Sequence, residues 1–189
     1  MEREQILDAA AELFTRYGYR ATSLDKVAKR LGVTKAALYH YYRSKGEILY
    51  EIHLRVVTQH LEMMTPIVRS DLPAAEKLRR VIRAHIDALL RHLPRVTVFF
   101  REGHELPPRY ARKIALRSRE YTALVQDLVE SGIKEGAFRK LDPQIVAFSI
   151  LALCNSLYHW YDPQGRVFPA ELADLYVELL SRGYLKAPE

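Results

Sequence analysis

Apolar residues recur every three or four positions along almost the whole chain, and this spacing predicts helices throughout. The alternation of β-branched and polar residues that is typical of strands is missing. Glycine and proline fall between the apolar segments, where helices end or begin. We therefore predict an all-α protein of about nine helices. After three N-terminal helices, the pattern predicts further helices over residues 44–65 (ended by Pro66), 74–92, 94–103, a short piece near 109, 114–135 (interrupted at Gly132), 142–161 and 169–184.

The second and third helices are short and lie close together in the chain. Thr22 or Ser23 can cap the N-terminus of the second helix, and Gly32 can end it. Thr34 can then cap the third. Two short helices separated by a glycine-containing turn predict a helix-turn-helix, here over about residues 23–42.

The third helix has two different sides when it is drawn at about 100° per residue. One side is expected to pack against the first two helices, and it is formed by Ala37, Leu38, Tyr41 and Tyr42. The opposite, exposed side is formed by Lys35, Ala36, Tyr39 and His40. Lys35 can reach a phosphate or a guanine edge, and the small Ala36 lets the backbone approach a thymine methyl. Tyr39 and His40 can donate hydrogen bonds to phosphate oxygens.

Positive charge is concentrated in two regions of a chain whose net charge is +6. Residues 20–45 hold seven lysines and arginines against Asp25 alone. Residues 91–119 hold eight against Glu102 and Glu105. The first region surrounds the helix-turn-helix, so duplex DNA is the expected partner there. The second region needs a separate explanation.

Residues 3–50, with ILDAAAELFTRYGYRATSLDKVAKRLGVTKAALYHYYRSKGEIL at their centre, closely resemble the DNA-binding domain of TetR-family transcriptional regulators. The matching features are the A-x-x-L-F-x-x-x-G-Y start, Thr22-Ser23, the L-G-V-T turn and L-Y-x-Y-Y-x-S-K. Tyr42 departs from the family, in which Phe is commoner at this position. The resemblance implies contacts with operator DNA from Thr22, Ser23, Thr34, Lys35, Ala36, Tyr39, His40 and Lys45.

The same resemblance implies an organisation and a mechanism. We expect a DNA-binding domain over residues 1–48 and an effector-binding and dimerisation domain over 49–189. The family implies a homodimer on a palindromic operator, and the broad apolar faces of VAFSILALCNSLYHWY and ELADLYVELL suit a helical interface between two subunits. Repression relieved by a small-molecule effector is the favoured mechanism, and activation and corepression stay open.

The C-terminal part resembles, more weakly, members that respond to acyl-CoA thioesters. The similar features are Phe-Phe-x-Glu, G-x-F-x-x-x-D and Asn-x-x-x-x-Trp-Tyr. Coenzyme A would need guanidinium groups beside an apolar channel. The residues expected to bind it are Phe99, Phe100, Arg109, Arg112, Lys113, Arg117 and Tyr121. Two alternatives stay open: an uncharged or cationic hydrophobic effector, as in multidrug-type TetR regulators, and a basic face that is merely solvated.

Other functional classes find little support. Helical metal-ligand spacing, a P-loop, a Rossmann glycine fingerprint and a G-x-S-x-G elbow are all missing, so we expect no enzyme, cofactor or metal. The lone Cys154 lies among apolar residues and is expected to be a packed thiol. No apolar run approaches a membrane span, and the N-terminus does not resemble a signal peptide, so the expected location is the cytoplasm. A further alternative is a ligand-binding or structural helical protein in which the helix-turn-helix serves only packing. This alternative does not explain the exposed Lys35, Tyr39 and His40.

Overall fold

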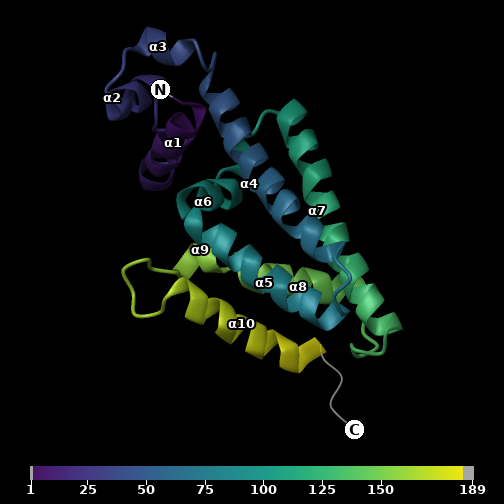
Figure 1. The fold of residues 1–189 in the computed structure, drawn as a ribbon. Helices are drawn as coiled ribbons and strands as arrows, with labels where there is room; N and C mark the ends of the chain where they lie inside the picture. The colour runs from purple at the N-terminus through teal and green to yellow at the C-terminus, as the bar shows by residue number, and fades with distance from the viewer. Residues whose placement is uncertain (1, 185–189) are drawn as a thin grey trace. The chain divides into compact units, whose positions relative to one another are not determined.

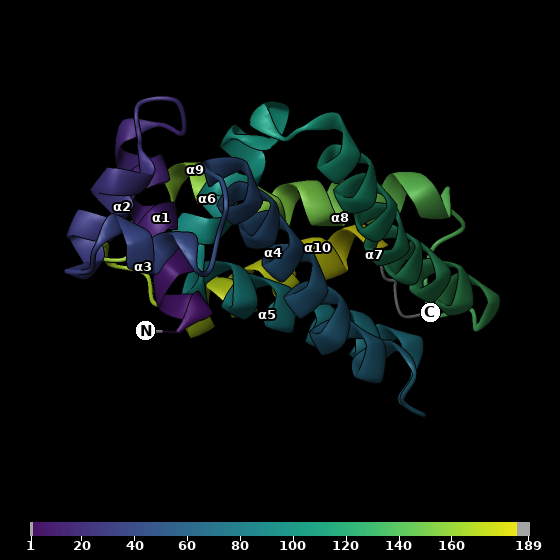
Figure 2. The ribbon, with the colours of Figure 1, turned by 90° about the horizontal axis from the view of Figure 1, so that it is seen from above.

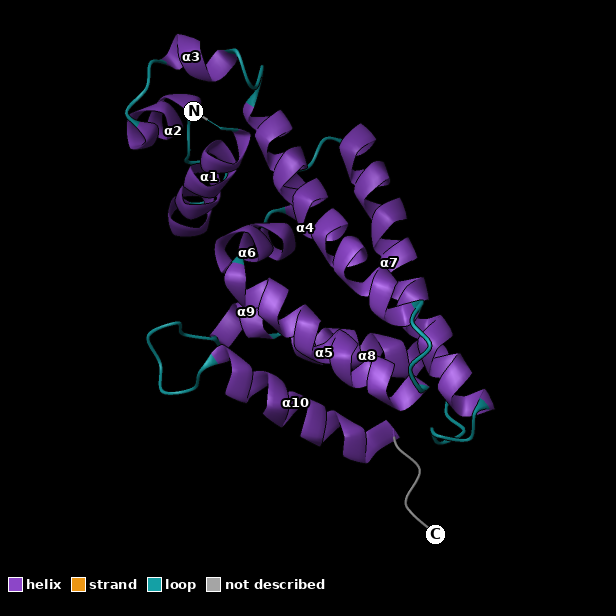
Figure 3. Cartoon of the chain, viewed as in Figure 1, coloured by secondary structure: helices purple, strands orange, loops and turns teal. Residues whose placement is uncertain are grey.

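The computed structural model describes residues 2–184, and within them the chain is helical and forms no extended strand (Figure 3). The all-α prediction is therefore confirmed. In chain order the elements are α1 (Arg3–Tyr17), α2 (Leu24–Leu31), α3 (Lys35–Tyr39), α4 (Lys45–Val68), α5 (Ala74–Arg91), α6 (Leu93–Arg101), the 3-10 helix η1 (Gly103–Glu105), α7 (Pro108–Lys134), α8 (Pro143–Asn155), α9 (Leu157–Trp160) and α10 (Pro169–Tyr184) (Figure 1).

The described chain packs as two compact units. Unit 1 contains the residues up to 58 together with 92–116, and unit 2 contains 59–91 together with the residues from 117 onward. This division differs from a simple cut after residue 48, because α6 packs against α1 within unit 1. The two sequence-based domains, 1–48 and 49–189, stay a prediction about function.

In unit 1, the first three helices form a small cluster, which Figures 1 and 2 both show. Its centre is built from Leu7 and Phe14 of α1, Val27 of α2, Leu38 of α3 and Tyr42 just beyond α3, all buried. Burying an apolar side chain of this size stabilises the fold by roughly 1.5–3 kcal/mol. The short helices α2 and α3 therefore depend on this packing more than on their own helix propensity.

The caps predicted for the helix-turn-helix are present. The Ser23 hydroxyl accepts a hydrogen bond from the backbone N–H of Lys26 at 3.2 Å, at the start of α2. Gly32 ends α2 with φ of 68°, a left-handed conformation that favours glycine. The Thr34 hydroxyl accepts from the N–H of Ala37 at 3.2 Å and begins α3. Local sequence signals thus fix both ends of the turn.

In unit 2, α5 packs against α10 and α8. Its buried face includes Leu78, Val81, Ile82 and Ile86. At the start of α8, the Asp142 carboxylate accepts from the N–H groups of residues 144 and 145, as its capping position predicts. None of the helices among residues 2–184 combines the length and the apolar character that crossing a bilayer requires.

Proline does not end α4 where the sequence predicts. The helix continues through Pro66 to Val68. Proline has no backbone N–H, so it removes one helical hydrogen bond, and its ring clashes with the preceding turn. Because Pro66 lies in the last turn of α4, only the end of the helix is affected. The prediction that the helix stops at residue 65 is therefore wrong by three residues.

Glycine does not interrupt α7, and the short piece near residue 109 belongs to the same helix. Instead, α7 runs unbroken from Pro108 to Lys134. A Cβ atom at Gly132 would lie 2.2 Å from the ring of Phe138, so glycine is required here by packing. Glycine inside a helix costs only about 0.5–1 kcal/mol relative to alanine, which the contact with a buried phenylalanine offsets.

The helix predicted over 142–161 is divided in two at Ser156. The Ser156 hydroxyl donates to the carbonyl of Leu153 at 2.7 Å, within the last turn of α8. A serine hydroxyl that bonds a preceding carbonyl competes with the helical ladder. The four-residue α9 then follows as a separate element.

Candidate nucleic-acid interface

The helix α3 presents a polar face to solvent. Leu38 is fully buried, whereas the residues of the opposite face are all exposed: Thr34, Lys35, Ala36, Tyr39 and His40. Tyr42 is also buried, and Tyr41 is half-buried. The two sides predicted from the sequence are thus present, with one side docked and the other free within unit 1.

Lys35 forms an ion pair with α2 on this face. Its Nζ lies 2.9 Å from Oδ1 of Asp25, and this hydrogen-bonded carboxylate raises the pKa of the Lys35 ammonium. Both side chains are more than half exposed. Exposed ion pairs of this kind are worth little because water and salt screen them. Lys35 can therefore exchange Asp25 for a DNA phosphate at small cost.

Thr22 and Ser23 occupy different environments at the start of α2. Thr22 is buried, and its hydroxyl donates to the carbonyl of Gly18 at 2.9 Å. Ser23 is exposed and serves as the N-cap. The hydroxyl of Thr22 is thus engaged within the protein, while Ser23 lies at a helix N-terminus, where backbone N–H groups favour anions.

Lys45 is engaged with the chain itself. Its ammonium donates to the carbonyls of Tyr19, Arg20 and Thr22 at 2.7, 3.3 and 2.8 Å. Burial lowers the pKa of Lys45, an effect that the nearby Glu102 and Glu105 oppose. The ammonium of Lys45 is thus surrounded by three backbone acceptors of its own chain.

The expected effector residues fall into three groups. In unit 1, the α7 residues Arg109, Arg112 and Lys113 are exposed on one helical face together with Leu116. The Arg109 guanidinium lies over the ring of Tyr110 at 4.6 Å. Apart from the contacts with Tyr110, the three basic side chains have no partner among the described residues. They form a positively charged patch, hereafter the α7 basic face.

The second group lies on α6, also in unit 1. Phe99 and Phe100 contact each other edge to face with ring centroids 5.1 Å apart. Phe99 also contacts the buried ring of His53 at 5.1 Å. Burial lowers the pKa of His53 to about 4, so its imidazole is neutral near pH 7.

Arg117 and Tyr121 lie on the part of α7 that belongs to unit 2. Arg117 pairs with Glu120 at 3.2 Å on the surface. The Tyr121 hydroxyl donates to Nδ1 of His85, and Nε2 of His85 donates to Oδ1 of Asn155 at 2.9 Å. This pairing follows because the amide oxygen can only accept, which places the imidazole proton on Nε2.

His85, Tyr121 and Asn155 thus form a polar cluster inside unit 2, and the ring of His60 lies 4.9 Å from that of His85. The sequence did not predict this cluster. Burial and the neighbouring His60 lower the pKa of His85 to about 3. Burial also raises the pKa of Tyr121. The only signal in the sequence was a histidine at an inward position of α5, with an asparagine ending an apolar helix. His85 and Asn155 lie 70 positions apart in the chain, and no local pattern in the sequence indicates that they are in contact.

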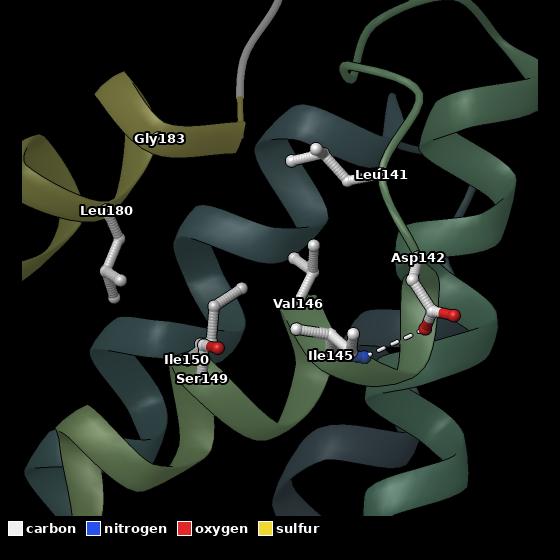
Figure 4. Close-up of a pocket in the computed structure, with 8 residues that line it drawn as sticks. All are labelled: Leu141, Asp142, Ile145, Val146, Ser149, Ile150, Leu180 and Gly183. Atoms are coloured by element: carbon white, nitrogen blue, oxygen red, sulfur yellow. Dashed lines mark hydrogen bonds between the residues drawn. The ribbon is translucent and has the colours of Figure 1, made fainter.

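An apolar face remains uncovered in unit 2. Large side chains on α8 and α10 are more than half exposed: Ile145, Phe148, Leu175 and Leu179. Between the same helices lies a hollow of about 370 Å³. Figure 4 shows four of the residues that line it: Leu141, then Val146 and Ile150 of α8, and Leu180 of α10. Leu141 directly precedes Asp142, the N-cap of α8. Large exposed apolar patches are common at sites where proteins associate.

The side chains that could bind a metal ion are dispersed over the described part of the chain. Across residues 2–184, no three side chains from His, Cys, Asp and Glu gather closely enough to hold a metal ion. Cys154 is buried, and burial raises the pKa of its thiol to about 12, which makes it unreactive near neutral pH.

Comparisons with known proteins agree with the geometry. Residues 6–52 match the family model described as "Bacterial regulatory proteins, tetR family". Residues 71–184 match the model described as "Tetracyclin repressor-like, C-terminal domain". The chain is 32% identical to the TetR-family regulator PfmR from Thermus thermophilus, whose crystal structure superposes with a TM-score of 0.88 over 94% of this chain and 97% of PfmR.

Two further relatives match nearly the whole chain, and the solved structure of one of them contains a ligand. The transcriptional repressor KstR2 of Mycobacterium tuberculosis is 27% identical over 97% of this chain and 93% of its own length. A crystal structure of AibR in complex with isovaleryl coenzyme A and operator DNA matches with 28% identity and a TM-score of 0.84, over 94% of this chain and 97% of AibR. The matches to both family models, together with the helix-turn-helix, establish that the chain belongs to the TetR family of transcriptional regulators.

Proposed function

We propose that this TetR-family regulator is a homodimeric repressor that binds a palindromic operator through α3 and is released by a small anionic effector. The observation that carries DNA binding is the exposed face of α3. Lys35, Tyr39 and His40 lie at the surface there, and their side chains suit phosphate and base-edge contacts. TetR regulators bind operators as dimers, which would place two such helices about 34 Å apart in successive major grooves.

Gel shift with the DNA upstream of the protein's own gene tests the operator proposal. We expect a discrete complex that weakens steeply with salt, because counterions return to the phosphates. Lys35→Met and Tyr39→Phe should weaken this complex. Lys140→Met, which removes an exposed lysine from unit 2, is the matched control and should not. A complex that tolerates both α3 variants would argue against the proposal.

The apolar face of α8 and α10 supports the dimer. Its exposed Ile145, Phe148, Leu175 and Leu179 would be covered by the same face of a second copy, giving a symmetric interface. The hollow beside Val146 and Leu180 would receive apolar side chains of the partner.

For the effector we propose an acyl-CoA thioester. Its phosphates would bind the α7 basic face, where Arg109, Arg112 and Lys113 lie exposed without a carboxylate partner among the described residues. The relative AibR supports this class, because its crystal structure contains isovaleryl coenzyme A. Phe99, Phe100, Arg117 and Tyr121 stay predictions as further ligand contacts.

Calorimetry with isovaleryl-CoA, a long-chain acyl-CoA and free coenzyme A tests the effector class. We expect at least one thioester to bind and to dissociate the DNA complex. Arg112→Gln/Lys113→Gln should weaken binding, whereas Arg182→Gln, on α10, should not. If no CoA compound binds and an uncharged or cationic hydrophobic compound does, the multidrug-type alternative replaces this proposal.

The direction of regulation is a separate question, because named relatives include both repressors and activators. A reporter joined to the upstream DNA decides it. Loss of the regulator should raise transcription if the protein represses, and lower it if the protein activates.

A further inference from the structure

Lys45 is an expected operator contact whose charged group is engaged within its own chain. It is the first residue of α4, and its ammonium donates to three backbone carbonyls, those of Tyr19, Arg20 and Thr22. An ammonium carries three protons, so these carbonyls use its whole donor capacity. The distances of 2.7, 3.3 and 2.8 Å converge on one nitrogen.

The three carbonyls belong to the loop of residues 18–22, which joins α1 to α2. The ring of Tyr19 adds a cation–π contact, with its centroid 4.2 Å from Nζ of Lys45. Two acidic residues at η1 accept hydrogen bonds from N–H groups of the same loop. Glu102 accepts from the N–H of Tyr19 at 3.3 Å, and Glu105 accepts from Nε of Arg20 at 2.6 Å.

These contacts decide how the helix-turn-helix begins. Thr22 directly precedes Ser23, the N-cap of α2. α2 in turn packs against α3 and supplies Asp25, the ion-pair partner of Lys35. Without the ammonium, the three loop carbonyls would need water as their hydrogen-bond donor, and the loop would lose its hydrogen bonds to α4.

We infer that Lys45 is a positioning residue that fixes loop 18–22 to the start of α4, and that it does not contact a DNA phosphate. It would thereby hold α2 and α3 in the arrangement that presents Lys35, Tyr39 and His40. The inference concerns the operator binding proposed above, and rests on it for its functional meaning.

Two substitutions at Lys45 and one at Lys35 test the inference in the full-length protein. Lys45→Met keeps the aliphatic stem and removes the donors. Lys45→Arg keeps the positive charge, and a guanidinium binds phosphate well. Its N–H groups lie in one plane, however, so they cannot replace the three donors that the ammonium directs at the three carbonyls. Lys35→Met is the control for loss of a phosphate contact. The readouts are hydrogen exchange of the peptide over residues 18–24 and the salt dependence of binding to the upstream DNA.

We expect Lys45→Met and Lys45→Arg to speed exchange over residues 18–24 by about tenfold or more, because the loop opens locally. Both should weaken DNA binding without changing the slope of log K against log salt. Lys35→Met should leave exchange unchanged and reduce that slope by about 0.9 for each phosphate that is no longer neutralised.

The opposite pattern overturns the inference. If Lys45→Met leaves exchange unchanged and lowers the salt slope as Lys35→Met does, or if Lys45→Arg preserves both exchange and affinity, Lys45 is a phosphate contact. Should the wild-type protein bind no upstream DNA, the proposed function fails by that result alone. The exchange measurement needs no DNA and still decides whether Lys45 holds the loop.

Discussion

At the scale of single residues, Arg95 is the most buried charge among the described residues of unit 1, with 2% of its side chain exposed. Its guanidinium joins α6 to α1 through Glu4 at 2.7 Å and Asp8 at 2.7 Å. The two carboxylates are about half exposed. Water can therefore solvate the acids if the pair is broken, but it cannot reach the guanidinium.

This asymmetry gives a prediction about stability. Glu4→Gln/Asp8→Asn leaves the buried guanidinium of Arg95 without a counter-charge and should lower the free energy of unfolding by about 3–5 kcal/mol. Arg95→Met keeps the buried stem and frees two acids that water can solvate, so its cost should be smaller, about 1–3 kcal/mol. Urea denaturation measures both. A larger loss for Arg95→Met would show that the acids are not as accessible as their exposure indicates.

Buried histidines should make the protein sensitive to acid. The pKa of folded His85 is about 3, whereas an unfolded histidine titrates near 6.5. Between these pH values the unfolded chain binds more protons, so stability falls as the pH falls from about 6.5 toward 3. His53, with a folded pKa of about 4, adds to the same trend.

We therefore expect the free energy of unfolding to drop by roughly 1.4 kcal/mol per histidine for each pH unit within this window. Urea denaturation between pH 7.5 and pH 4.5 measures the slope. His85→Gln should reduce the slope, although it also destabilises the protein at pH 7 by breaking the contacts with Tyr121 and Asn155. His159→Gln, at an exposed site, should leave the slope as it is.

At the scale of elements, the ends of helices were predictable where a local signal sets them. Ser23, Thr34 and Asp142 cap their helices as expected, and Gly32 ends α2. The inner and outer sides of α3 followed from helical periodicity alone, because one helical face has to be buried. These predictions needed no information about distant residues.

Predictions failed where a distant contact decides the outcome. Gly132 looked like a helix breaker because its partner, Phe138, could not be recognised from the sequence. The backbone contacts of Lys45 were not predictable either, because a lysine at a helix start gives no sign that three carbonyls of another segment surround it. Tertiary packing overrides local propensity at such positions.

Alanine substitution of two helical glycines separates packing from propensity. Gly132→Ala should destabilise the protein by about 1–3 kcal/mol or more, because the new Cβ would overlap the ring of Phe138. Gly183→Ala, on α10 where a Cβ meets no atom within 4 Å, should be neutral or stabilise by up to about 1 kcal/mol. Thermal unfolding of the pair, each against wild type, measures this contrast. Equal effects would mean that Phe138 can move aside.

At the scale of the whole molecule, the exposed apolar face of α8 and α10 gives the sharpest prediction, because it links assembly to operator binding. A carboxylate at a buried, symmetric interface is placed near its own copy and cannot be solvated, so association should be lost. Phe148→Glu and Leu179→Glu should therefore convert a dimer into a monomer of 21.9 kDa.

The monomer should retain its fold, since Phe148 and Leu179 are already more than half exposed in the single chain. It should nevertheless lose most of its operator affinity, because one α3 helix reads only one half-site. Leu116→Glu is the matched control: Leu116 is 60% exposed but lies on α7, and its substitution should leave the dimer intact. Sedimentation velocity and gel shift measure mass and binding on the same samples. If the α8 and α10 variants stay dimeric while Leu116→Glu dissociates, the dimer is formed by α7 and the face assigned here is not the interface.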